Sequence, residues 1–105
     1  MQIQINTDSN IEGREKVAAH VREVVERSLS RFRERITRVE VHLGDENGLK
    51  SGQDDKRCMM EVRLENHQPL AVTHHAANLD QAINGALNKL ERTIESTLGR
   101  LHDHH

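Results

Sequence analysis

The sequence predicts an α+β domain with the element order β-α-β-β-β-α, in which two helices pack on one face of a four-stranded mixed sheet. Four segments alternate apolar and polar residues, and two longer segments carry apolar residues at three- and four-residue spacing. Short connections between the last three alternating segments favour antiparallel pairing. A helix separates the first two, which are parallel if they are adjacent. The length of 105 residues suits a single domain.

The N-terminal third predicts the first strand and the first helix. Ile3 and Ile5 share one face of a strand expected at residues 2–6. Ser9 and Glu12 have the spacing of a capping box, which predicts a helix from about residue 10 to about residue 33. Its expected buried stripe consists of Val17, Val21, Val24, Val25, Ser28 and Phe32.

Three further strands are expected in the middle of the chain. In the second strand, Val39, Val41 and Leu43 share the apolar face. The polar, glycine-containing segment 44–55 predicts a mobile loop. The apolar face of the third strand consists of Cys58, Met60, Val62 and Leu64. A tight connection then leads to a fourth strand at residues 70–75.

The second helix has clear signals at its beginning. Asn78 is the expected N-cap, and Asp80 in the first turn favours the helix dipole. The expected buried stripe consists of Leu79, Ile83, Ala86, Leu87, Leu90, Ile94 and Leu98. The helix ends at Gly99 or two residues later, so the folded domain is expected at residues 1–101, with residues 102–105 as a short His-rich tail.

Composition limits the functions that this domain can have. Phe32 is its one aromatic residue, which excludes the aromatic stacking platforms of RNA-recognition motifs and OB-folds. The net charge is −2, so a nucleic acid could be bound only by a local basic patch. No apolar run approaches the ~20 residues of a membrane span, and the N-terminus lacks a secretory signal pattern. Together with the single Cys58, these features predict a cytoplasmic protein without a membrane partner.

The sequence contains no pattern typical of catalysis. Cys58 falls on the apolar side of its strand, so its thiol is expected in the core. The glycines of segment 44–52 lack the spacing of a phosphate-binding loop. Asp54 and Asp55 are expected in a solvated loop, without apolar neighbours that would raise a carboxyl pKa. We therefore expect a protein that is not an enzyme, with no cofactor and no small-molecule substrate.

The eight histidines are candidates for metal binding, but their placement argues against a site. His74 and His75 are adjacent on a strand, so they point to opposite faces and cannot share one metal ion. We expect His74 to be partly buried near the second helix. The remaining candidates lie at the frayed C-terminus: His102, His104 and His105.

Basic residues recur at helical spacing on both helices. Those on the second helix lie away from its apolar stripe and include Lys89, Arg92 and Arg100. Those on or near a stripe of the first helix include Arg22, Arg27, Arg31 and Arg35. Two helices that carry outward-facing Lys and Arg suit shape-based binding to phosphates and 2′-hydroxyl groups of structured RNA. The alternative is that both stripes are ordinary solvated helix faces.

Three segments carry a resemblance to a known family: residues 1–5 with the amphipathic helix that follows, residues 36–43, and residues 79–92. The third is the most specific, because it resembles the family's helix A-I-D-x-L-x-D-K-L-E-R-Q. The chain is thus similar, over nearly its whole length, to the short ribosome hibernation-promoting factors. This family includes ribosome-associated inhibitor A and is also described as sigma-54 modulation or S30EA-type ribosomal proteins.

The resemblance implies a fold like that of double-stranded-RNA-binding domains and makes residues 1–101 a ribosome-binding domain. It also implies binding to rRNA phosphates of the small ribosomal subunit, in the mRNA channel and at the A and P tRNA sites. Family members bound there block initiation and protect idle ribosomes. Lys89 and Arg92 match basic positions of the family's helix motif, whereas Arg27 and Arg31 are assigned by their helical face alone.

The chain departs from the family pattern in two places. Asp80 replaces an aromatic residue near the start of the second helix, and residues 99–105 replace a lysine-rich tail. The chain also stops where long members continue into a dimerising domain, so no C-terminal dimerisation domain is expected. Two other hypotheses remain open: a His-rich metal-binding module, and a small protein-interaction domain whose sheet face, including Arg57 and Met59, docks a partner.

Overall fold

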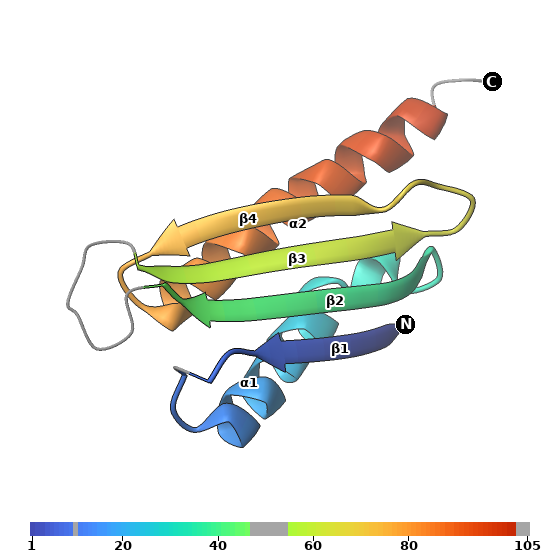
Figure 1. Ribbon diagram of the computed structural model, residues 1–105. Helices are drawn as coiled ribbons and strands as arrows, with labels where there is room; N and C mark the ends of the chain where they lie inside the picture. Colours follow the sequence, from blue (N-terminus) through green and yellow to red (C-terminus); the bar gives the residue numbers. More distant parts are fainter. Residues whose placement is uncertain (10, 47–54, 103–105) are drawn as a thin grey trace.

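The computed structural model describes residues 1–9, 11–46 and 55–102. Its elements are, in chain order, β1 (Gln2–Thr7), α1 (Arg14–Ser28), the 3₁₀ helix η1 (Ser30–Phe32), β2 (Ile36–Asp45), β3 (Lys56–Leu64), β4 (Leu70–Ala76) and α2 (Leu79–His102). In Figure 1 the sheet lies in front and both α-helices lie behind it, on the same face. The predicted fold class and element order are confirmed.

The described strands form one four-stranded sheet in the order β1-β2-β3-β4. β1 and β2 run parallel, with Ile5 opposite Val41, and α1 makes the crossover between them. The other two pairings are antiparallel, and they place Met60 opposite Val41 on one side and opposite Val72 on the other. This register puts the apolar residues of all four strands on the face that the helices cover.

The core lies between that face of the sheet and the two helices. Its fully buried side chains include Val21, Val25 and Leu29 from α1 and its C-cap, Val39, Val41, Met60 and Val62 from the sheet, and Leu90 and Ile94 from α2. Cys58 is also fully buried, as its place in the strand alternation predicted. Burial raises the pKa of the Cys58 thiol to about 12, so the thiol is protonated at neutral pH and unreactive.

The beginning of α1 shows that the capping box predicted at Ser9 and Glu12 is wrong. The N-cap is Gly13, and no described side chain caps the helix there. Gly13 has φ 65° and ψ 42°, a left-handed conformation that glycine adopts without the steric cost of a Cβ. Before it, Ile11 is buried at 6% exposure. The chain therefore enters the core first, and the helix begins only afterwards, at Arg14.

The end of α1 also differs from the prediction, which extended the helix to about residue 33. α1 ends at Ser28, and the tighter winding of η1 follows. Leu29 is fully buried, whereas Ser28, which was expected in the stripe, is only half-buried. Leu29 continues the four-residue spacing of Val21 and Val25, and the 3₁₀ step from Leu29 then brings Phe32 into the core.

The predicted mobile loop at residues 44–55 is shorter in the structure. β2 continues to Asp45, and β3 begins at Lys56. Residues 47–54, and with them the prediction for Asp54, lie outside the described residues.

An ion-paired cluster closes the base of this hairpin. Asp45 and Asp55 are buried at 7% and 6% exposure, so the expectation of a solvated carboxylate is wrong for Asp55. The Lys56 Nζ lies 3.2 Å from a carboxylate oxygen of Asp45 and 3.3 Å from one of Asp55. Desolvation lowers the pKa of Lys56, but the two carboxylates outweigh it and raise this pKa above its ordinary value. The positive charge of Lys56 thus offsets part of the cost of burying the two carboxylates.

α2 begins as the sequence predicted. The Asn78 Oδ1 accepts a hydrogen bond from the Gln81 N–H at 2.9 Å, which satisfies one of the free donors of the first turn. The helix continues to His102, one residue into the predicted tail. The other tail residues, 103–105, lie outside the described residues.

Candidate nucleic-acid interface

Two of the predicted basic residues, Lys89 and Arg92, are exposed on α2, away from its buried stripe. The Lys89 Nζ donates a hydrogen bond to the backbone carbonyl of Thr73 in β4 at 2.9 Å. The Arg92 guanidinium has no ion pair or hydrogen bond with any described residue. Lys89 is therefore tied to the edge of the sheet, while Arg92 is available to an external anion. Arg100 follows in α2, and its side chain lies outside the described part.

The predicted basic residues of the first helix already have partners within the molecule. Arg27 forms an ion pair with Glu23, one turn earlier, at 2.8 Å. Arg31, in η1, forms an ion pair with Glu95 of α2. The Arg31 guanidinium also lies 4.5 Å from the centroid of the Phe32 ring, within the range of a cation–π contact. Any phosphate bound by these arginines must compete with these partners.

Arg22 lies apart from the basic residues of α2. Its Nη1 donates a hydrogen bond to the Ile3 carbonyl in β1 at 2.7 Å. It lines a polar hollow of about 540 Å³ at this edge of the sheet. Since β1 and β4 are the opposite edges of the sheet, Arg22 and Lys89 lie on opposite sides of the helical layer. The predicted site residues do not form one compact cluster.

The structure does bring Arg31 and Arg92, two of the predicted residues, into one region. Glu95, which contacts Arg31, follows Arg92 by three residues on α2 and therefore lies on the same face of that helix. The ion pair thus places Arg31 beside the turn of α2 that carries Arg92. Sequence reasoning missed Glu95, because its partner is 64 residues away in the chain.

The turn between η1 and β2 adds two exposed arginines that the predicted site did not include. Arg33 and Arg35 are exposed, and their side chains make no ion pair with a described residue. The helical spacing places Arg35 on a stripe of the first helix, but α1 ends before it. The sequence signal for both residues is the basic segment that follows Phe32. This segment forms a turn and not a helix.

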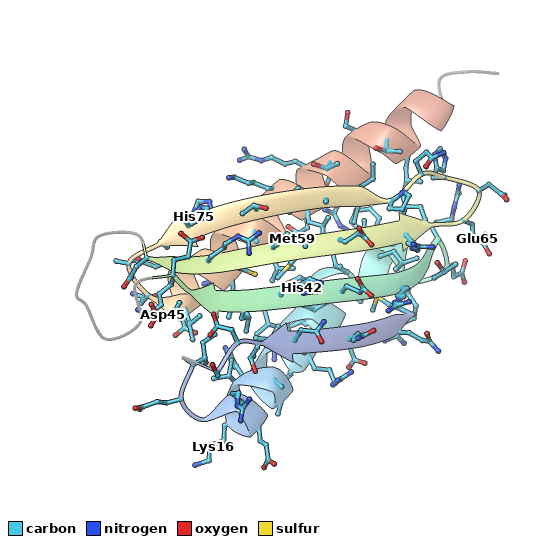
Figure 2. All side chains as sticks on the ribbon, in the orientation of Figure 1. Lys16, His42, Asp45, Met59, Glu65 and His75 are labelled. Carbon is cyan, nitrogen blue, oxygen red and sulfur yellow. The ribbon has the colours of Figure 1, made fainter. Side chains whose placement is uncertain are left out.

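The open face of the sheet carries several charge pairs. Figure 2 shows His42, Met59 and His75 on this face, which is turned away from the helices. His42 lies 3.7 Å from Glu40, which also pairs with Arg38. The remaining described pairs on this face share Glu46, which lies 3.1 Å from His75 and 3.8 Å from Arg57. This face therefore offers anions and cations in close alternation, unlike a basic surface.

The histidines on β4 are separated as predicted. His74 is half-buried and places its imidazole ring against Gly85 of α2, whereas His75 is exposed on the open face. Within the described residues, no group of three or more His, Cys, Asp or Glu side chains is placed to hold a metal ion. In the same part of the chain, no helix combines the length and the apolar character that crossing a membrane requires.

Comparison with known proteins adds the family. Residues 3–102 match the family described as sigma 54 modulation protein / S30EA ribosomal protein. No curated protein matches the chain. The Protein Y N-terminal domain of Thermus thermophilus has a TM-score of 0.71 and 22% identity, with 92% of this chain and 99% of that chain covered. A ribosomal subunit interface protein from Coxiella burnetii has a TM-score of 0.69 and 16% identity, with 94% and 99% covered.

The two kinds of similarity support different conclusions. At 22% and 16% identity, the solved structures establish the fold, a four-stranded mixed sheet with two helices on one face. The family match covers almost the whole sequence. The chain therefore belongs to the family of sigma 54 modulation proteins / S30EA ribosomal proteins, a class of ribosome-associated factors and not of enzymes.

Proposed function

We propose that this protein is a translation regulator that binds the small ribosomal subunit at the mRNA channel and the A and P tRNA sites. Bound there, it inactivates idle ribosomes and protects them. The family match over residues 3–102 carries this proposal. Ribosome association also supports a cytoplasmic location. We further propose residues 1–101 as the ribosome-binding unit.

The helical layer is the surface we propose for rRNA. It carries Arg92, which has no partner among the described residues, and Lys89, which is held by a neutral carbonyl. It also carries Arg33 and Arg35 in the turn between η1 and β2. Phe32 is 9% exposed, so no aromatic side chain of the described residues is free for base stacking. Recognition through phosphates and the shape of folded RNA fits this composition. The open sheet face, where Arg38 and Arg57 are paired with glutamates, fits it less well.

A competition experiment tests the proposed location on the ribosome. The protein is mixed with purified bacterial small subunits, either vacant or loaded with mRNA and P-site tRNA, and sedimented through sucrose. We expect stoichiometric binding to vacant subunits and loss of binding to loaded subunits, because the ligands would occupy the same channel. Large subunits are the control for general attraction to RNA. Equal binding to vacant and loaded subunits would place the protein elsewhere.

A further inference from the structure

Arg31 of η1 and Glu95 of α2 form an ion pair, and Arg92 precedes Glu95 by three residues on the same face of α2. We infer that Arg31 and Arg92 form one phosphate-binding subsite that spans the two helical segments, and that Glu95 occupies this subsite in the free protein. The ligand class is the phosphodiester groups of folded RNA. The inference rests on the proposed function and adds to it a residue that sets affinity by competing with the RNA.

Arg31 is held in place before any ligand binds. Its guanidinium stacks at 4.5 Å over Phe32, whose ring is buried in the core. A planar guanidinium that stacks on a fixed ring has fewer conformations to lose when it binds an anion. The group nevertheless stays accessible, because the Arg31 side chain is 57% exposed and the Glu95 side chain 50%.

The Glu95 carboxylate resembles a phosphate in the donors that it accepts. The guanidinium presents its N–H donors in a fork that fits two oxygens of a carboxylate or of a phosphate. Both anions therefore compete for the same donors. The Arg31–Glu95 pair is half exposed, and an exposed ion pair is weak enough for a phosphate in a dense array to displace the carboxylate.

Arg92 supplies the second cation. It precedes Glu95 by three residues on the same helix face, is exposed, and has no charged partner among the described residues. A phosphodiester that replaces Glu95 at Arg31 would thus also meet Arg92, which Glu95 does not use. This additional contact with Arg92 favours the RNA phosphate over the Glu95 carboxylate.

The contact also differs from the other arginine–carboxylate pairs of the described residues. Arg27 pairs with Glu23 within α1, and Arg38 pairs with Glu40 within β2. The Arg31–Glu95 pair alone among them joins η1 to α2. Glu40 therefore offers a control of the same residue type that is also paired with an arginine, on the opposite face of the domain.

The experiment compares Glu95→Gln with Glu40→Gln for binding to purified bacterial small subunits at fixed salt. Both variants gain the same net charge. We expect Glu95→Gln to bind about two- to fivefold more tightly than the parent, since an exposed pair no longer has to be broken. Glu40→Gln should bind like the parent. In the Arg31→Gln background, the gain from Glu95→Gln should disappear. Equal affinities of the two single variants would overturn the inference.

A second measurement separates this inference from the proposed function. If the parent does not bind small subunits, the proposed function is wrong, and titration with a short RNA duplex then decides the inference. The readout is the NMR signal of the Arg31 Nε–H group. We expect it to shift at a lower duplex concentration in Glu95→Gln than in Glu40→Gln. A shift at the same concentration in both variants, or no shift in either, would overturn the inference.

Discussion

Gly85 shows how a single absent side chain determines the packing between α2 and the sheet. A Cβ at this position would lie 2.1 Å from Cδ2 and 2.5 Å from Cγ of His74 on β4. Because Cγ is the root of the imidazole ring, the whole ring would have to leave its place. The glycine therefore lets a half-buried histidine pack directly on the helix backbone.

Substitution of Gly85 by alanine tests this contact. Alanine favours a helix over glycine by about 1 kcal/mol, but overpacking against a fixed ring costs about 1–3 kcal/mol. We expect Gly85→Ala to lower the free energy of unfolding in urea. The same change at Gly99, where a Cβ would meet nothing within 4 Å, should leave stability equal or higher.

A second substitution identifies the cause of that loss. In the His74→Ala background, Gly85→Ala should no longer destabilise the protein, because the clashing ring is gone. If Gly85→Ala lowers stability equally with and without His74, the cost comes from another contact.

At the scale of elements, alternation and helical spacing were sufficient to predict which segments form strands and helices. The ends of α1 were not predictable from local signals. Ser9 and Glu12 have the right spacing for a cap, but burial of Ile11 and the left-handed Gly13 decide where the helix begins. At the other end, Leu29 continues the four-residue spacing of Val21 and Val25, but α1 stops at Ser28 and η1 follows. The entry through Ile11 and Gly13 is a consequence of tertiary packing, which overrides local preference.

The candidate site, too, was predicted in part from local sequence patterns, while its tertiary contacts were not. Helical spacing placed Lys89 and Arg92 on the solvent side of α2, and the structure agrees. Their neighbours could not be foreseen, because the contacts join distant parts of the chain. Lys89 binds the Thr73 carbonyl 16 residues away, and Arg31 binds Glu95 64 residues away.

The basic face of α2 can be tested by reversing its charge. In the variant Lys89→Glu/Arg92→Glu, two carboxylates would oppose the rRNA phosphates, so we expect affinity for small subunits to fall about tenfold or more. Stability should stay within about 1 kcal/mol of the parent, because both side chains are exposed and only the Lys89–Thr73 hydrogen bond is lost. Co-sedimentation measures the first quantity and urea unfolding the second.

The matched control is Arg63→Glu on the open sheet face, where the side chain is exposed. It should bind small subunits nearly as well as the parent. Equal co-sedimentation of the parent and the double variant would remove α2 from the interface. Loss of binding by Arg63→Glu would move the interface to the open face.

On the scale of the whole molecule, attraction to RNA cannot come from net charge, which is −2. The described arginines Arg27, Arg31 and Arg38 are each balanced by a glutamate. Long-range steering is therefore weak, and binding depends on the few phosphates that make direct contact. Arg22 and Lys89 lie toward opposite edges of the sheet, so a rigid RNA surface would have to follow the helical layer to touch both.

This arrangement predicts a definite salt dependence. Each neutralised phosphate contributes about −0.9 to the slope of log affinity against log salt, so four to six contacts would lower affinity by about two to three orders of magnitude between 50 and 200 mM KCl. Magnesium is held constant so that the subunits stay folded. In Lys89→Glu/Arg92→Glu the slope should flatten by about two, one unit for each lost phosphate contact. Glu40→Gln, on the open face, should keep the parent slope. Salt-independent binding by the parent would indicate that a ribosomal protein surface, and not rRNA, is the principal contact.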